Sequence, residues 1–190
     1  VTFGSFNKFA KISPLTVTMW AGVLRAIPTA RLILKSKALT EEITCERLQS
    51  MFSEQGIAID RLQLMGWESS DDAHLRLYNS IDIALDTFPY NGTATTCEAL
   101  WMGVPVITLK GDKFISRCGY SINKNAGLND FIADTKDDYI SIALNSVTYN
   151  GIEKLKSYRK NLRSKIISSP LFDVQNFSDN FADKLYTIKN

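Results

Sequence analysis

The sequence predicts an α/β protein built on a doubly wound parallel sheet, and two observations support this fold class. Short apolar segments recur along residues 1–109, and segments with helical spacing separate them. The apolar segments do not alternate with polar residues, which is typical of parallel strands covered on both faces. Regular alternation of strand and helix signals then favours one open sheet with helices on its two sides.

The first strand, helix and second strand have clear boundary signals. Residues 1–6 are short and rich in β-formers, so they predict a strand. Ser13 and Pro14 predict a helix start, because serine caps free N–H groups and proline at the first helical position has none to lose. Apolar residues then recur at helical spacing until Pro28, and residues 30–34 predict the second strand.

The same alternation continues to residue 109. It predicts helices at residues 40–55, 71–79 and 94–102, and strands at residues 62–66, 81–85 and 104–109. Gly56 and Gly103 stand where two of these helices end, as glycine commonly does. From about Lys113 onward the pattern predicts helix only.

The C-terminal segment, residues 174–190, is predicted to be a final helix. Phe177, Phe181, Leu185 and Ile188 give it an apolar stripe. We expect most of this stripe to pack on the protein's own sheet, with part of it left as an interface for a missing partner.

Length and composition limit the function classes. The 190 residues suit one domain spanning 1–190. A net charge of +2 gives no reason to expect nucleic-acid or membrane-surface binding. Three widely spaced cysteines predict reduced thiols in a cytoplasmic protein, and a single histidine argues against structural zinc. No signal peptide is visible in the given residues, and they contain no run of ~20 apolar residues. The start at Val1 indicates a domain cut from a longer protein.

Ligands of open α/β sheets bind beyond the carboxyl ends of the strands, so two loops are candidates. The loop at residues 4–12 lacks the GxGxxG dinucleotide fingerprint but carries Lys8 and Lys11. A lysine here either neutralises a phosphate or is a solvated surface residue.

The second loop, residues 86–98, runs from an apolar strand through Asn91-Gly92 into a helix start rich in threonine. Free N–H groups and the helix dipole can hold an anion at such a site, and Glu98 can accept hydrogen bonds from a ribose diol. The alternative is an ordinary capped helix. His74 either stacks on a base or caps its helix, and Asp71-Asp72 are read as dipole complements, not as metal ligands.

Three segments together resemble a known family. Residues 80–106, the Phe-Asn loop at residues 6–12 and the Ser-Pro-Leu-Phe segment at residues 169–172 resemble the bacterial branch of the O-GlcNAc-transferase family, glycosyltransferase family 41. The family has two Rossmann-like halves in a GT-B arrangement, usually behind tetratricopeptide repeats. The resemblance implies that this chain is the C-terminal half, which binds the UDP part of the donor.

The resemblance also implies residue roles. Lys11 matches the catalytic lysine that neutralises the departing diphosphate, Glu98 faces the ribose, and His74 lies close to the uracil and ribose. The segment at residues 67–70 passes along the base edge. The donor-binding residues implied in this way are Asn7, Lys8, Ser69, His74, Asn91, Gly92, Thr93, Ala94, Thr95, Thr96 and Glu98.

The implied reaction is inverting transfer, without metal or other cofactor, from a UDP-sugar such as UDP-GlcNAc to a Ser or Thr hydroxyl. The implied partners are the N-terminal half, the repeats and, through that half, a protein acceptor, so the fragment alone is expected to be inactive. Two alternatives stay open: a UDP-glucose-dependent enzyme that modifies asparagine, and a non-catalytic nucleotide-binding or interaction module.

Four positions depart from eukaryotic members. Lys8 replaces glutamine, Thr93 replaces histidine, Asp71 replaces lysine and Leu77 replaces arginine. These replacements remove positive charge near the ribose. The donor affinity and donor choice of eukaryotic members are therefore not expected to hold for this chain.

Overall fold

A computed structural model describes residues 1–68 and 70–189 of the chain. Within these residues, six parallel strands form a sheet in the order β3-β2-β1-β4-β5-β6. The strands are β1 (Thr2–Ser5), β2 (Arg31–Lys35), β3 (Leu62–Met65), β4 (Ile83–Leu85), β5 (Val106–Leu109) and β6 (Ile132–Ala133). The predicted doubly wound sheet is confirmed.

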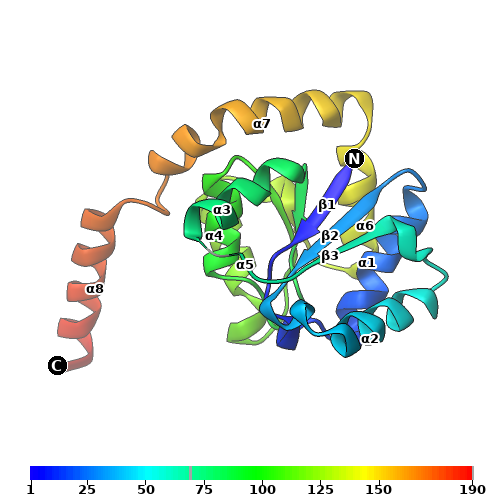
Figure 1. The fold of residues 1–190 in the computed structure, drawn as a ribbon. Coiled ribbons are helices and arrows are strands. Elements are labelled where there is room, and N and C mark those ends of the chain that lie inside the picture. The colour runs from blue at the N-terminus through cyan, green and yellow to red at the C-terminus, as the bar shows by residue number, and fades with distance from the viewer. Residues whose placement is uncertain (69, 190) are drawn as a thin grey trace.

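Helices cover both faces of this sheet (Figure 1). One side carries α1, α2 and α6, and the other carries α3, α4 and α5. Their bounds, with those of the two last helices, are α1 (Pro14–Ala26), α2 (Glu42–Ser53), α3 (Asp71–Leu77), α4 (Ala94–Trp101), α5 (Cys118–Asn125), α6 (Lys136–Ser146), α7 (Tyr149–Ile167) and α8 (Val174–Lys189). Most residues of β1, β2, β4 and β5 are buried between these layers, which explains why their apolar runs lack alternation, whereas the edge strand β3 is only half-buried.

The strand order reverses between β1 and β4. From β1 the chain moves outward through β2 to β3, then crosses back to place β4 on the other side of β1, with Phe3 opposite Ile83. In sheets of this kind a crevice opens at the carboxyl ends of the two strands that flank the reversal. The loops after β1 and β4 are therefore neighbours, although some 80 residues separate them.

The predicted boundary signals act as expected. The Ser13 hydroxyl accepts a hydrogen bond from the Thr16 amide at 3.1 Å, with Pro14 as the first residue of α1. Gly56 and Gly103 follow α2 and α4 with φ angles of 75° and 78°. This left-handed conformation is strained for residues that carry a Cβ atom, and it turns the chain out of each helix.

The prediction of helix only after Lys113 is wrong at one place. Ile132 and Ala133 form a sixth strand, which pairs with Thr108 and Leu109 of β5. Two residues are too few to produce a readable periodicity, and the strand exists because the edge of β5 offers partners to its backbone.

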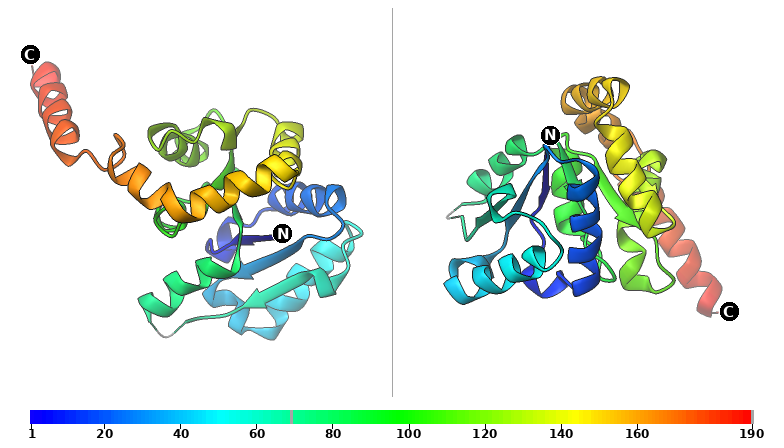
Figure 2. Two further views of the ribbon diagram at one scale, coloured as in Figure 1. Left: turned by 90° about the horizontal axis from the view of Figure 1, so that it is seen from above. Right: turned by 90° about the vertical axis from the view of Figure 1, so that its right-hand side faces the viewer.

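The prediction that the apolar stripe of the last helix packs mostly on its own sheet is also wrong. Figures 1 and 2 show α8 extending away from the sheet. Phe177, Phe181, Leu185 and Ile188 are 69%, 56%, 53% and 82% exposed. The connection after α7 directs α8 outward, so amphipathic spacing here marks a helix without a partner surface in this chain.

The helix α7 crosses the amino ends of the strands, opposite the candidate ligand site (Figure 1). The guanidinium of Arg159 donates to the carbonyl oxygens of Tyr78 and Met102 at 3.1 and 3.0 Å, and also to that of Ile81. These carbonyls precede β4 and β5. One side chain therefore ties α7 to two segments of the sheet.

The three cysteines, Cys45, Cys97 and Cys118, lie in α2, α4 and α5 and are free thiols. Among the described residues, no helix combines the length and apolarity needed to span a membrane.

Candidate functional site

The two candidate loops, which follow β1 and β4, meet at the carboxyl edge of the sheet. The hydroxyl of Thr95 donates to the side-chain oxygen of Asn7 at 2.9 Å. The ammonium of Lys11 donates to the carbonyl of Asn91 at 2.8 Å. The structure thus brings the predicted residues of the two loops into direct contact.

A buried carboxyl group holds the second loop in shape. One oxygen of Asp86 accepts hydrogen bonds from the amides of Gly92 at 2.6 Å and Thr87 at 2.9 Å. The other accepts from the Thr108 hydroxyl at 2.7 Å. Burial raises the pKa of Asp86 to about 7, while these three donors and Lys11 oppose the rise. No role for Asp86 was predicted from the sequence, because its burial and its contact with Thr108 arise only in the folded chain.

The turn before α4 is tightly packed. A Cβ atom added to Gly92 would lie 2.7 Å from the hydroxyl oxygens of both Thr95 and Thr96, and 3.0 Å from the side-chain oxygen of Asn7. Glycine is therefore required for the close approach of the turn to the helix start.

The start of α4 offers unpaired donors. Thr93 occupies the N-cap position without a side-chain cap. Within the described residues, no acceptor pairs with the backbone N–H groups of Thr93, Ala94, Thr95 or Thr96. Such N–H groups, together with the helix dipole, form an anion site of the kind the sequence predicted.

Lys11 lies beside this helix start. It ends the short 3-10 helix η1 (Phe9–Lys11), and its Nζ atom is 4.1 Å from the centroid of the Tyr90 ring. Burial lowers the pKa of Lys11, and the nearby Asp86 opposes that shift. Lys8, in contrast, is exposed to solvent. Of the two predicted lysines, the fold holds Lys11 in place.

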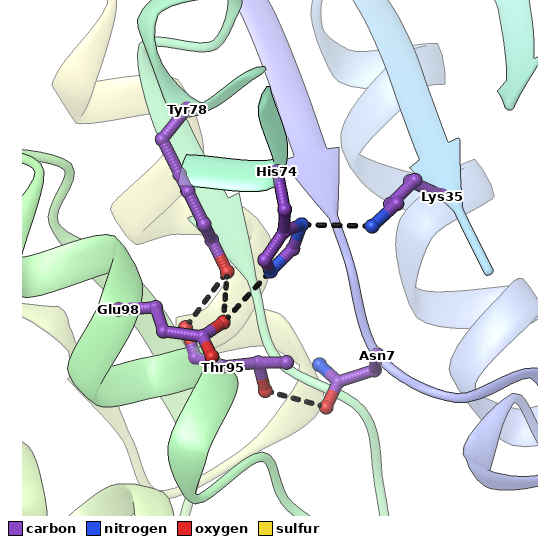
Figure 3. A network of polar contacts seen from close by, with 6 residues as sticks. All are labelled: Asn7, Lys35, His74, Tyr78, Thr95 and Glu98. Atoms are coloured by element: carbon purple, nitrogen blue, oxygen red, sulfur yellow. Dashed lines mark hydrogen bonds and ion pairs between the residues drawn. The ribbon is translucent and has the colours of Figure 1, made fainter. Parts of the chain in front are cut away.

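Next to the anion site lies a network of polar side chains (Figure 3). His74 in α3 contacts Glu98 of α4, with Nε2 3.0 Å from Oε2. The Tyr78 hydroxyl also donates to Glu98 Oε2, at 3.1 Å. On its other side, the His74 ring places Nδ1 2.8 Å from Nζ of Lys35 at the end of β2. The predicted residues His74 and Glu98 are thus joined directly.

Lys35 and Tyr78 were not predicted from the sequence. Lys35 is buried at the end of an apolar strand, and burial lowers its pKa while Glu68 and Glu98 oppose the shift. A lysine that ends a buried strand at the ligand edge of the sheet is a readable signal. Burial also raises the pKa of Tyr78 far above its ordinary value. This tyrosine is therefore a lasting hydrogen-bond donor.

The structure describes part of the segment at residues 67–70, which was predicted to pass along the edge of the base. Trp67 follows β3 with 66% of its surface exposed, and its ring lies 5.6 Å from Nζ of Lys35. The prediction for Ser69 lies outside the described residues. An exposed aromatic ring beside the network offers a stacking surface for a planar group.

Two other hollows lie elsewhere on the described residues. One lies between α6 and α7 and is lined by Ile142 and Leu155, and another lies at the amino end of β1, beside Thr2 and Arg31. Both are lined by charged side chains, but neither is lined by the loops after β1 and β4. The carboxyl edge of the sheet gathers a free helix terminus and titratable groups, which is why we assign the site there. Across residues 1–68 and 70–189, His, Cys, Asp and Glu side chains form no cluster of three that would suit a metal ion.

Comparisons with known proteins identify the family of the chain. Residues 1–181 match the family model described as Glycosyl transferase family 41. A probable UDP-N-acetylglucosamine–peptide N-acetylglucosaminyltransferase of Hordeum vulgare, SPINDLY, is 38% identical over 178 residues. That match covers 94% of this chain and 19% of the relative, so the chain spans about a fifth of the relative's length.

Two solved structures are similar as well. A mutant of the O-GlcNAc transferase of Thermobaculum terrenum superposes with a TM-score of 0.85 at 37% identity, covering 95% of this chain and 35% of that one. Anabaena Alr3699/HepE, solved in complex with UDP and glucose, superposes with a TM-score of 0.65 at 16% identity, covering 98% of this chain and 48% of that one. The second likeness concerns the fold alone.

Proposed function

The chain belongs to glycosyltransferase family 41, and from that membership we propose that it is the donor-binding half of a protein O-glycosyltransferase that uses UDP-GlcNAc. One observation carries this proposal: the unpaired amides at the start of α4 and the ammonium of Lys11 converge beside a carboxylate, Glu98. This combination of donors and an acceptor suits a diphosphate joined to a ribose.

In this proposal each group has one task. The amides of residues 93–96 bind the diphosphate, assisted by the threonine hydroxyls, and Lys11 neutralises the charge that develops as the sugar leaves. Glu98 accepts from the ribose hydroxyls, and His74 and Trp67 lie toward the base. Transfer proceeds with inversion and without a metal, so these preorganised donors stabilise the leaving group. Each donor of that kind is typically worth a few kcal/mol in the transition state.

The rest of the active site belongs to a second half that this chain does not contain. The relative from Hordeum vulgare is about five times as long as the matched region, which leaves room for such a half and for repeats. The exposed stripe of α8 is suited to contact that half. The acceptor protein then binds mainly outside this chain, and the isolated chain binds the donor but does not transfer the sugar.

Calorimetric titration tests the binding part of the proposal. The chain is titrated with UDP, UDP-GlcNAc, UDP-glucose and, as a purine control, GDP. We expect UDP to bind and UDP-GlcNAc to bind more tightly than UDP-glucose. No binding of UDP at millimolar concentration would favour the non-catalytic interaction module. A preference for UDP-glucose would favour the asparagine-modifying alternative.

Lys11→Ala tests the catalytic part, in a protein that carries both halves. We expect turnover to fall below detection while UDP affinity falls much less, because Lys11 acts mainly on charge that develops during transfer. The matched control is Lys124→Ala, which removes an exposed lysine from α5. Near-normal turnover of the Lys11 variant would refute its assignment.

A further inference from the structure

Lys35 determines which nitrogen of His74 carries the proton. It ends β2 with only 7% of its surface exposed, and its Nζ lies 2.8 Å from Nδ1 of His74. A lysine ammonium has three N–H donors and no acceptor, so Nδ1 must accept this hydrogen bond. A neutral imidazole that accepts at Nδ1 carries its proton on Nε2.

That tautomer has a consequence for Glu98. His74 Nε2 lies 3.0 Å from Oε2 of Glu98, and with its proton there it donates to that oxygen. The hydroxyl of Tyr78 lies 3.1 Å from the same oxygen and 3.2 Å from the carbonyl oxygen of Thr95, so the two acceptors share its one proton. Within the part of the chain that the structure describes, no protein donor reaches Oε1 of Glu98. One carboxylate oxygen is therefore fixed by the protein, and the other is left for a ligand.

We propose that Lys35 is a positioning residue of the nucleotide site: by setting the tautomer of His74, it holds Glu98 so that Oε1 accepts from the ribose hydroxyls. This inference rests on the proposed function, because the ribose is the ligand that it names. It is more specific, since it assigns a task to Lys35, whose hydrogen bond is to His74 and not to the loops after β1 and β4.

A simpler explanation is that Lys35 only adds positive charge for the diphosphate. The chain offers a matched control for that explanation. Lys37 lies two residues further on, and its Nζ is 5.8 Å from the centroid of the Trp67 ring, against 5.6 Å for Lys35. Lys37→Met removes the same charge beside the same ring but leaves the contact with His74 intact.

The first experiment is nitrogen NMR of the imidazole ring. His74 is the only histidine of the chain, so the ¹⁵N imidazole spectrum of the 190-residue chain reports this ring alone. In the unmodified chain we expect Nε2 to be protonated and Nδ1 to be an unprotonated acceptor. Lys35→Met should shift the Nδ1 signal and populate the second tautomer, whereas Lys37→Met should leave the spectrum unchanged.

The unmodified chain alone tests the first step, so a poorly folding variant does not end the test. The opposite tautomer, with the proton on Nδ1, would overturn the proposal. An unchanged spectrum in a folded Lys35→Met chain would overturn it too.

The second experiment measures binding of UDP and of 2′,3′-dideoxy-UDP, which lacks the ribose hydroxyls. For Lys35→Met we expect the Kd of UDP to rise roughly five- to tenfold, as for a weakened hydrogen bond to a charged group, and that of dideoxy-UDP to change less than about twofold. If Lys35→Met weakens both ligands equally, or no more than Lys37→Met does, the charge explanation is correct and the proposal fails. If the unmodified chain binds no UDP, the proposed function fails, and the ribose part of this inference fails with it. The nitrogen spectrum still tests the link between Lys35 and His74.

Discussion

The buried carboxyl group of Asp86 makes an unusual prediction about stability. Asp86→Asn preserves the shape of the side chain and can preserve its hydrogen bonds. The remaining oxygen can accept from the amides of Gly92 and Thr87, and the new NH₂ group can donate to the hydroxyl of Thr108, which has free lone pairs. The substitution therefore removes mainly the ability to ionise.

The size and sign of the effect follow from the pKa. Burial raises the pKa of Asp86 from its ordinary 3.8 to about 7. At about 1.4 kcal/mol per pKa unit, the linked free energy is on the order of 4 kcal/mol. Because the folded state keeps a proton that the unfolded chain has lost, this stabilisation is fully present below pH 3.8 and is lost as the pH rises to about 7. The Asp86→Asn variant has no ionisable group at this position, so its stability should not fall in this way as the pH rises.

The assay is urea unfolding of both proteins between pH 5 and pH 8, followed by tryptophan fluorescence. The free energy of unfolding of the variant, relative to the unmodified chain, should rise by about 2–3 kcal/mol across that range. Asp112→Asn, at an exposed aspartate, is the control and should show no such trend. If Asp86→Asn is instead less stable at pH 8 and the deficit shrinks in acid, the three donors and Lys11 outweigh burial. That result would refute the reasoning.

Three further predictions concern packing. Gly92→Ala should weaken UDP binding roughly tenfold by calorimetry, because its Cβ atom would crowd the hydroxyls at the start of α4, and affinity within twofold would contradict this. Arg159→Met should lower the free energy of unfolding, measured in urea, by about 2–4 kcal/mol, because it leaves carbonyl oxygens without their donor. The control Lys160→Met, on the same helix, should change that free energy by less than about 0.5 kcal/mol. Deletion of residues 174–190 should change the melting temperature by less than about 2 °C, as the stripe of α8 is exposed, and a loss above about 5 °C would show that α8 packs on the domain.

Much of the fold was predictable because it depends on local patterns. Apolar runs, the Ser13-Pro14 start and the glycines after α2 and α4 all act within a few residues of where they stand. The strand β6 was missed because two residues carry no period, and its pairing with β5 is a tertiary contact. The outward course of α8 was missed for a similar reason, since amphipathic spacing does not identify the surface that a helix covers.

The candidate site divides in the same way. Its two loops were predicted from turn and helix-start residues, and the role of Lys11 was implied by the resemblance to the family. Lys35 escaped because its partner His74 is 39 residues away. Asp86 escaped because its burial and its contact with Thr108, 22 residues away, arise only in the folded chain. A side chain whose role is to hold another side chain has no local signature.

The reversal of strand order between β1 and β4 also has a consequence for how the chain folds. Lys11 meets a partner 80 residues away, and Asn7 meets one 88 residues away, so each contact closes a long loop. Long-range parallel pairing forms slowly, whereas helices form from local contacts within microseconds. A refolding chain should therefore recover its helical signal well before it recovers ligand binding. The time at which it first binds a nucleotide would then mark the docking of β4 against β1.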